Sequence, residues 1–91
     1  METKTYTLIT GGTSGIGYEL AKIFAKNGNN LILVARDEAD LTITRNELLG
    51  LGVDVQIISK DLFDRQAPFE LYDEICSKEY DVEILVNNAG Q

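Results

Sequence analysis

The chain is 91 residues long, which suffices for one small domain and is too short for two. Hydrophobic residues at 44% and charged residues at 25% match an ordinary folded protein and exclude a disordered tail. A formal net charge of −7 repels phosphate backbones, so we expect neither nucleic acid nor an anionic membrane as a partner. The first residues, METKTYTLIT, have no long apolar run behind a basic start, so we expect no signal peptide or membrane span and a cytoplasmic location.

Residues 5–10 (TYTLIT) predict a strand, and the segment that follows, IGYELAKIFAKNG, predicts a helix that ends at Gly28. The apolar spacing predicts that one face of this helix packs on the sheet, formed by Ile16, Leu20, Ile23, Phe24 and Asn27. Residues 31–35 (LILVA) show no polar alternation, which is typical of a parallel strand buried on both faces.

A second helix is predicted to begin after the cap residue Asp37 and to end at Gly50. Residues 53–59 alternate apolar and polar side chains, as a half-covered outer strand would. A third helix is predicted over 67–79 with a proline in its first turn, and a fourth strand over 82–86.

The third helix carries the only cysteine, Cys76, four residues after Tyr72, and we expect it to pack rather than react. With one cysteine and no histidine, the chain can form no internal disulfide, multi-cysteine metal site or histidine acid–base pair. We therefore predict no metal site.

Strands and helices thus alternate along the whole chain. Alternation at this spacing predicts an α/β fold, a partial Rossmann-like doubly wound parallel sheet with strand order 3-2-1-4 and three crossover helices. Ligands bind such sheets at the carboxyl ends of the strands, where the order reverses between the first and fourth strands.

The turn after the first strand is rich in glycine, reading LITGGTSGIG. The unpaired N–H groups at the start of the next helix stabilise an anion without any cationic side chain. Gly11 would permit the tight exit from the strand, Gly15 the approach of a pyrophosphate, and Gly17 close packing of helix on sheet. The turn lacks the Gly-Lys-Ser/Thr signature of triphosphate-binding loops, and glycine is also common in ordinary turns.

Three motifs in their expected positions resemble the short-chain dehydrogenase/reductase family. They are Thr-Gly-x-x-x-Gly-x-Gly at residues 10–17, Asp61 and Leu62 after the third strand, and Asn-Asn-Ala-Gly at residues 87–90. The resemblance covers nearly the whole chain. Taken singly, the two asparagines are also simple turn formers.

The resemblance implies cofactor contacts for specific residues. Those implied to meet the phosphates and ribose are Thr13, Ser14 and Ile16, and those implied to pass beneath the ribose are Asn88, Ala89 and Gly90. Asp61 is similar to the carboxylate that binds the adenine amino group, with Leu62 beside it, whereas Asn87 is expected to tie the fourth strand to its neighbours.

The residues that end the second strand favour NADP over NAD. A carboxylate at this position would bind the ribose hydroxyls of NAD, but the sequence has Ala35 followed by Arg36. A guanidinium can hold the extra phosphate of NADP through paired hydrogen bonds. Asp37 is the competing ribose ligand, although it also suits a helix cap, and Arg36 could instead be a solvated surface charge.

In the family that this chain resembles, a serine and a Tyr-x-x-x-Lys pair act in catalysis, and they lie beyond the Asn-Asn-Ala-Gly motif. This chain has no counterpart there, so we expect residues 1–91 to be the N-terminal portion of a single NAD(P)-binding Rossmann domain without its C-terminal catalytic half. Tyr18 and Lys22 have the same spacing, but we expect them to face solvent or a neighbouring helix. We assign no catalytic residue.

The predicted function is therefore the NADP(H)-binding portion of a short-chain oxidoreductase, which moves hydride between NADPH and a carbonyl or hydroxyl compound. The alternatives are a non-catalytic nucleotide-binding or interaction module, or a truncated inactive product. We expect the apolar edge of the strand at 82–86 to promote self-association.

Overall fold

The structure is a computed structural model that describes residues 4–13 and 15–87. Its elements alternate strictly and are, in chain order, β1 (Thr5–Thr10), α1 (Gly15–Lys26), β2 (Asn30–Ala35), α2 (Glu38–Leu49), β3 (Val55–Ser59), α3 (Ala67–Ser77) and β4 (Asp81–Asn87). Every predicted element is present. Helix α3 ends before the predicted residue 79 because Lys78 caps it and Glu79 takes a left-handed conformation with φ of 57°.

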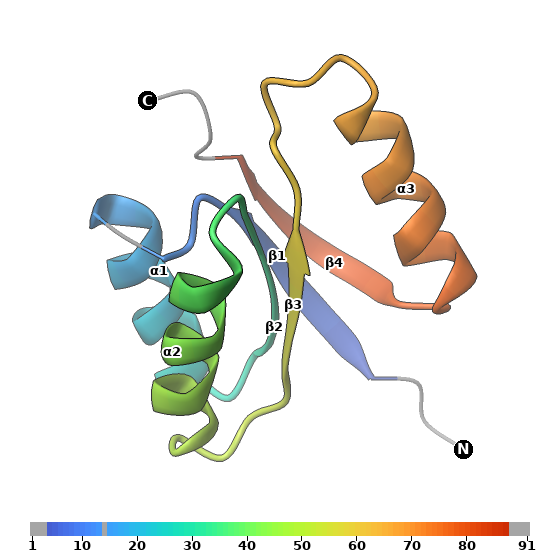
Figure 1. Cartoon of the computed structure of the whole chain (residues 1–91). Helices are drawn as coiled ribbons and strands as arrows, with labels where there is room; N and C mark the ends of the chain where they lie inside the picture. The colour runs from blue at the N-terminus through green and yellow to red at the C-terminus, as the bar shows by residue number, and fades with distance from the viewer. Residues whose placement is uncertain (1–3, 14, 88–91) are drawn as a thin grey trace.

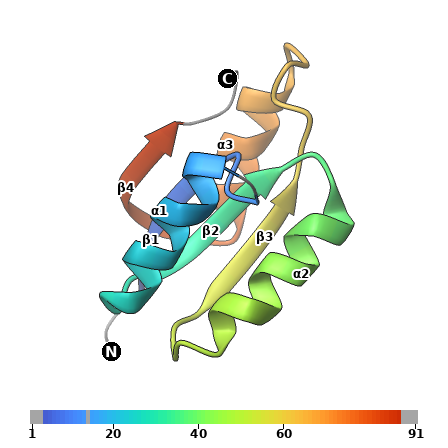
Figure 2. The ribbon, with the colours of Figure 1, turned by 90° about the vertical axis from the view of Figure 1, so that its left-hand side faces the viewer.

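The four strands form one parallel sheet in the order β3-β2-β1-β4, which confirms the predicted topology. Helices α1 and α2 cover one face of the sheet and α3 covers the other (Figure 1). Figure 2 looks onto the face with α1 and α2, with β4 and β3 at opposite edges. Because all strands are parallel, their carboxyl ends, and the loops that follow them, meet at one edge of the sheet.

Strand β2 lies at the centre of two hydrophobic clusters. Leu31 and Leu33 belong to the cluster beneath α1 and α2, whereas Ile32 and Val34 belong to the cluster beneath α3. All four side chains are fully buried. Helices on both faces therefore explain why this strand shows no polar alternation.

The predicted packing face of α1 is wrong in part, since Phe24 packs on the core as predicted but Ile16, Ile23 and Asn27 do not. The buried residues of α1 are Gly17, Ala21 and Ala25, whereas Ile16 and Ile23 are 69% and 54% exposed. Small side chains let the helix axis lie close to the sheet, and this close approach decides which face turns inward. The spacing of large apolar residues along the sequence therefore does not predict which face of α1 is buried.

Helix α3 covers its face of the sheet with few buried side chains. Ala67 is its one buried residue, and the half-buried Leu71 and Ile75 pack on the cluster around Leu8. The next stripe round the helix, with Tyr72 and Cys76, faces solvent. The expected packing role of Cys76 is therefore wrong, because the helix is rotated by about one residue from the predicted orientation.

Candidate functional site

The turn after β1 lies at the carboxyl edge of the sheet and depends on its glycines. Gly11 has a φ of 70°, and its N–H donates to the carbonyl oxygen of Val34 at 2.7 Å, so the chain turns across the end of β2. Gly15 opens α1 with a φ of 58°, and a Cβ built there meets no described residue within 4 Å beyond its neighbours in the chain and its own helix. The described residues therefore leave space beside Gly15 at the start of the helix.

Gly12 is a site residue to which the sequence gave no role. It is buried, and a Cβ there would lie 2.9 Å from Cδ2 of Leu33 and 3.4 Å from Cγ2 of Ile9. A side chain would push the turn away from the core. The signal was present in the sequence as a second glycine directly after a buried strand, but only the packing shows its cause.

The first turns of α1 and α2 differ in charge. The first turn of α1 contains no acidic residue, whereas α2 begins with Glu38 and Asp40. Asp37 also caps α2, accepting hydrogen bonds from the N–H groups of Ala39 at 2.9 Å and Asp40 at 3.2 Å. Of these two helices, α1 is thus the one suited to an external anion.

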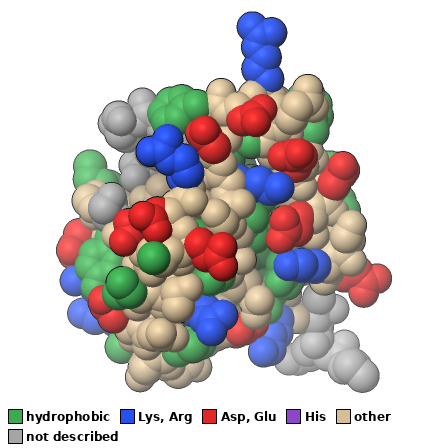
Figure 3. Space-filling view, viewed as in Figure 1, with side chains coloured by type: hydrophobic (Ala, Val, Ile, Leu, Met, Phe, Trp, Pro, Cys, Tyr) green, Lys and Arg blue, Asp and Glu red, His purple; other side chains and the backbone are tan. Residues whose placement is uncertain are grey.

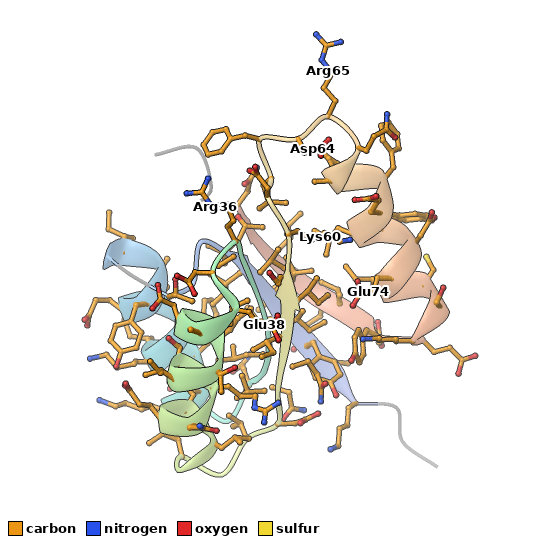
Figure 4. The ribbon with its side chains drawn as sticks, in the orientation of Figure 1. Arg36, Glu38, Lys60, Asp64, Arg65 and Glu74 are labelled. Atoms are coloured by element: carbon orange, nitrogen blue, oxygen red, sulfur yellow. The ribbon has the colours of Figure 1, made fainter. Side chains whose placement is uncertain are left out.

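Arg36 projects from the carboxyl end of β2 (Figure 4). Its side chain is exposed and forms no ion pair with any residue that the structure describes. Its backbone is held in place, because Ser59 Oγ donates to the carbonyl oxygen of Arg36 at 2.9 Å and the Lys60 N–H donates to that of Ala35 at 2.9 Å. The guanidinium is therefore available to a ligand at this edge.

Asp61 follows β3 at the same edge of the sheet. Its side chain is exposed, and its Oδ1 accepts a hydrogen bond from the Phe63 N–H at 3.1 Å within a local turn. Leu62 is half-buried and packs on the cluster beneath α3, so its side chain points into the core. The loop thus presents the carboxylate outward and anchors itself through the leucine.

The remaining predicted residues fall into two groups. Thr13 is half-buried in the turn, and Ile16 is exposed at the start of α1. Asn87 ends β4 and accepts a hydrogen bond at Oδ1 from Thr10 Oγ1 at 3.1 Å, which confirms its role in tying β4 to β1. The predicted residues that lie outside the described part of the chain are Ser14, Asn88, Ala89 and Gly90.

Tyr18 and Lys22 lie on the outer surface of α1. The Tyr18 hydroxyl donates to Glu47 of α2 at 2.5 Å, and the Lys22 ammonium lies 4.9 Å from the centre of the Tyr18 ring. The hydrogen bond to Glu47 raises the pKa of Tyr18. A tyrosine that donates protons in catalysis needs the opposite shift, so the pair joins two helices, as expected, and belongs to no acid–base site.

A known family accounts for this arrangement. The sequence profile of the short chain dehydrogenases matches residues 5–91. The chain belongs to the short-chain dehydrogenase family. Among its relatives, the very-long-chain 3-oxoacyl-CoA reductase of Eremothecium gossypii is 38% identical over 87 residues, covering 93% of this chain and 24% of the relative. This short-chain dehydrogenase chain thus spans about a quarter of that relative's length.

Solved structures of family members share the fold closely. The L-sorbose reductase of Gluconobacter frateurii, complexed with NADPH and L-sorbose, superposes with a TM-score of 0.87 at 33% identity, covering 98% of this chain and 34% of that one. A short-chain dehydrogenase of Sphingobium yanoikuyae in complex with NADPH gives a TM-score of 0.85 at 35% identity, covering 96% of this chain and 34% of that one. Both of these relatives hold NADPH.

Two other kinds of site are not found within residues 4–13 and 15–87. None of the helices there combines the length and apolar character needed to cross a bilayer. The same residues bring together no set of three histidine, cysteine or acidic side chains that could hold a metal ion.

Proposed function

We propose that this chain is the NADP(H)-binding portion of a short-chain oxidoreductase that transfers hydride between NADPH and a carbonyl or hydroxyl substrate. The observation that carries the proposal is the open, acid-free start of α1 behind Gly15. Backbone N–H groups there suit a pyrophosphate, which needs close approach and positive potential but no specific side chain. The NADPH-bound relatives support the same choice of ligand.

The preference for NADP over NAD rests on two neighbouring residues, Arg36 and Asp37, which differ in their contacts within the chain. The guanidinium of Arg36 forms no ion pair within the described structure, so it can take the additional phosphate of NADP. Asp37 already accepts two backbone hydrogen bonds as the cap of α2, which makes it a poor ribose ligand. If the Asp37 side chain rotated toward a ribose, α2 would lose its N-terminal cap, which contributes about 1 kcal/mol to stability.

The test is to titrate NADPH and NADH separately against the chain and its Arg36→Ala variant, following nucleotide fluorescence. We expect NADPH to bind about tenfold more weakly to the variant, because a charge-assisted hydrogen bond contributes about 1.5 kcal/mol or more. NADH affinity should change less than about twofold. Arg65→Ala is the matched control, since Arg65 also sits in a loop at this edge but projects away from Arg36 (Figure 4). Equal losses for both nucleotides would overturn the preference for NADP.

We further propose that residues 1–91 are the N-terminal portion of a single NAD(P)-binding Rossmann domain whose catalytic groups lie elsewhere. No described residue has the geometry of the family's tyrosine–lysine pair, since Tyr18 and Lys22 lie on the outside of α1. We expect the chain to bind NADPH without oxidising it in the presence of ketones. Steady NADPH oxidation at 340 nm would contradict this division. A cytoplasmic location stays a prediction.

We also propose that the chain self-associates through the β4 edge. Leu85 is 66% exposed on β4, and a largely apolar hollow of about 590 Å³ lies between β4, β1 and α3. We expect Leu85→Glu to convert associated chains into monomers in sedimentation experiments, whereas Leu51→Glu, remote from β4, should not. A wild-type chain that sediments as a monomer at all concentrations would refute it.

A further inference from the structure

We propose that the outer edge of β3 binds an extended peptide strand that carries two adjacent basic residues, in the cleft between α2 and α3. This inference is separate from nucleotide binding. It rests on a sheet edge with unpaired backbone groups, a cleft alongside that edge, and a carboxylate on each wall of the cleft.

Among the described strands, β3 has a partner on one side only. It pairs with β2 and is the last strand of the sheet on that side. The carbonyl oxygen of Asp54 accepts from the Leu31 N–H, and the Lys60 N–H donates to Ala35, both at 2.9 Å. Because backbone groups alternate along a strand, the even-numbered residues face β2 and the odd-numbered ones, Val55, Ile57 and Ser59, direct their N–H and C=O groups outward.

A cleft of about 230 Å³ runs along this edge. Its lining comes from three elements and consists of Glu38, Leu41, Ile57, Ile58, Ser59 and Glu74. Figure 1 views β3 from its outer edge, with α2 on one side and α3 on the other. A peptide laid along β3 would therefore pair its backbone with the strand and point its side chains at the two helices.

The charges of the cleft select a basic occupant. Glu38 of α2 and Glu74 of α3 lie on opposite sides of β3 (Figure 4), and none of the described residues that line the cleft is basic. Glu38 has no ion pair within the described part of the chain, and Glu74 pairs with Lys78 at 3.1 Å on the surface, where such a pair is readily exchanged. Lys60, beside the cleft, pairs with Glu70 at 3.5 Å. Figure 3 shows acidic side chains on both sides of the middle of this face, with basic side chains among them.

A second copy of the chain fits this edge poorly. Two copies paired through β3 about a two-fold axis would place both copies of Glu38 and Glu74 along one seam. Like charges opposed across an interface are destabilising, so a basic peptide is the better occupant.

The geometry also sets the spacing of the basic residues. Successive side chains of a strand point to opposite faces, so one lysine would reach Glu38 on α2 and the next would reach Glu74 on α3. Lysines separated by one residue would both point to the same helix. Adjacent lysines should therefore bind better than spaced ones in peptides of the same composition.

The test uses fluorescence anisotropy with three labelled hexapeptides. They are acetyl-Thr-Val-Lys-Lys-Val-Thr-amide, its isomer Thr-Lys-Val-Lys-Val-Thr, and the first peptide with backbone N-methyl groups on alternate residues. We expect the isomer to bind about threefold more weakly, because one ion pair contributes up to about 1 kcal/mol. N-methylation along the pairing edge should weaken binding about tenfold or more, because it removes backbone hydrogen bonds.

Variants of the chain separate charge from shape. Glu38→Gln/Glu74→Gln should weaken the adjacent-lysine peptide about three- to tenfold and abolish its advantage over the isomer. Glu19→Gln/Glu83→Gln removes the same charge away from the cleft and should change binding less than about twofold. Three results would each overturn the proposal: equal binding of the N-methylated peptide, equal binding to the glutamine variant, or no peptide binding at all. A dimer that Ile57→Pro dissociates, without peptide binding, would assign the edge to a second copy instead.

Discussion

Polar side chains at the two ends of the sheet differ in whether they bind one another or are exposed. At the amino end, Tyr6 donates to Asp54 at 2.5 Å, Gln56 donates to Asp54 at 3.1 Å, and Tyr80 donates to Gln56 at 3.2 Å. The Tyr6 and Tyr80 rings are 5.1 Å apart, and Lys4 lies 3.8 Å from Asp54. This network joins β1, the start of β3 and the turn between α3 and β4, so its polar groups satisfy one another.

At the carboxyl end, the side chains of Arg36 and Asp61 are instead exposed. Arg36 has no ion pair within the described chain, Asp61 makes a short local turn, and open space lies in front of Gly15. The contrast teaches that polarity alone does not mark a binding site. The carboxyl edge, where Arg36 forms no ion pair with any described residue, is the one that we propose for a ligand.

The amino-end network also perturbs proton binding. Burial and the hydrogen bond to Asp54 raise the pKa of Tyr6 to about 12. Burial alone would raise the pKa of Asp54, but hydrogen bonds from Tyr6 and Gln56 and the nearby Lys4 ammonium lower it below its usual value. Both shifts stabilise the fold at neutral pH, so this end is predicted to control stability and the other end ligand binding.

The largest expected effect comes from Gly15→Ala at the carboxyl end. A Cβ would stand in the space proposed for the pyrophosphate, so we expect NADPH affinity to fall on the order of 100-fold, or about 2.7 kcal/mol. The matched control is Gly28→Ala, because Gly28 also has a positive φ and open surroundings but lies at the far end of α1. Both variants should lose about 1 kcal/mol of stability, and only the first should lose NADPH. If the two variants bound NADPH with similar affinity, the start of α1 would not be the pyrophosphate site.

The next effect is on stability, from Asp54→Asn at the amino end. Removing the charge that accepts from Tyr6 and Gln56 should lower the free energy of unfolding by about 2 kcal/mol at pH 7, measured by urea denaturation. Because the pKa of Asp54 is lowered in the fold, the difference should persist above pH 3.8 and shrink as pH falls below it. NADPH affinity should stay within about twofold of the wild type. A stable variant with weak NADPH binding would reverse the assignment of the two ends.

Tyr6→Phe should have a smaller effect on the same network. We expect a loss of about 1.5 kcal/mol at neutral pH, because the hydroxyl donates to a carboxylate. The pKa of Tyr6 is raised from 10 to about 12, so its contribution is complete below pH 10 and disappears as pH rises toward 12. Denaturation curves of both proteins from pH 7 to about 11.5 measure this. A difference that stays constant over that range would exclude Tyr6 as the titrating group.

The smallest expected effect tests whether Asp37 belongs to the cap of α2 or to the nucleotide site. Asp37→Ala should cost about 1 kcal/mol of stability, because it removes the cap of α2, and Asp37→Asn should cost little. The ratio of NADPH to NADH affinity should not change in either variant. Were Asp37→Ala to alter NADH binding specifically, Asp37 would be a ribose ligand after all.

The sequence by itself determined the order of the elements and the sheet topology. The signals for these elements are local, and each determines the structure only within a few residues of its own position. They are the apolar runs of the buried strands, the Asp37 cap, the proline of α3 and the glycines at chain reversals. Alternation of strands and helices then permits very few topologies, because crossovers are right-handed. The glycine turn and Arg36 could be proposed as site residues for the same reason.

Only the tertiary structure decided which faces the helices turn inward and which polar groups are left without partners. Large apolar residues suggested that Ile16 and Ile23 pack inward, yet close approach to the sheet favoured Ala21 and Ala25. The packing role of Gly12 and the cleft beside β3 likewise depend on residues far apart in the chain. Packing is a property of pairs of surfaces, so a pattern read along one segment cannot contain it.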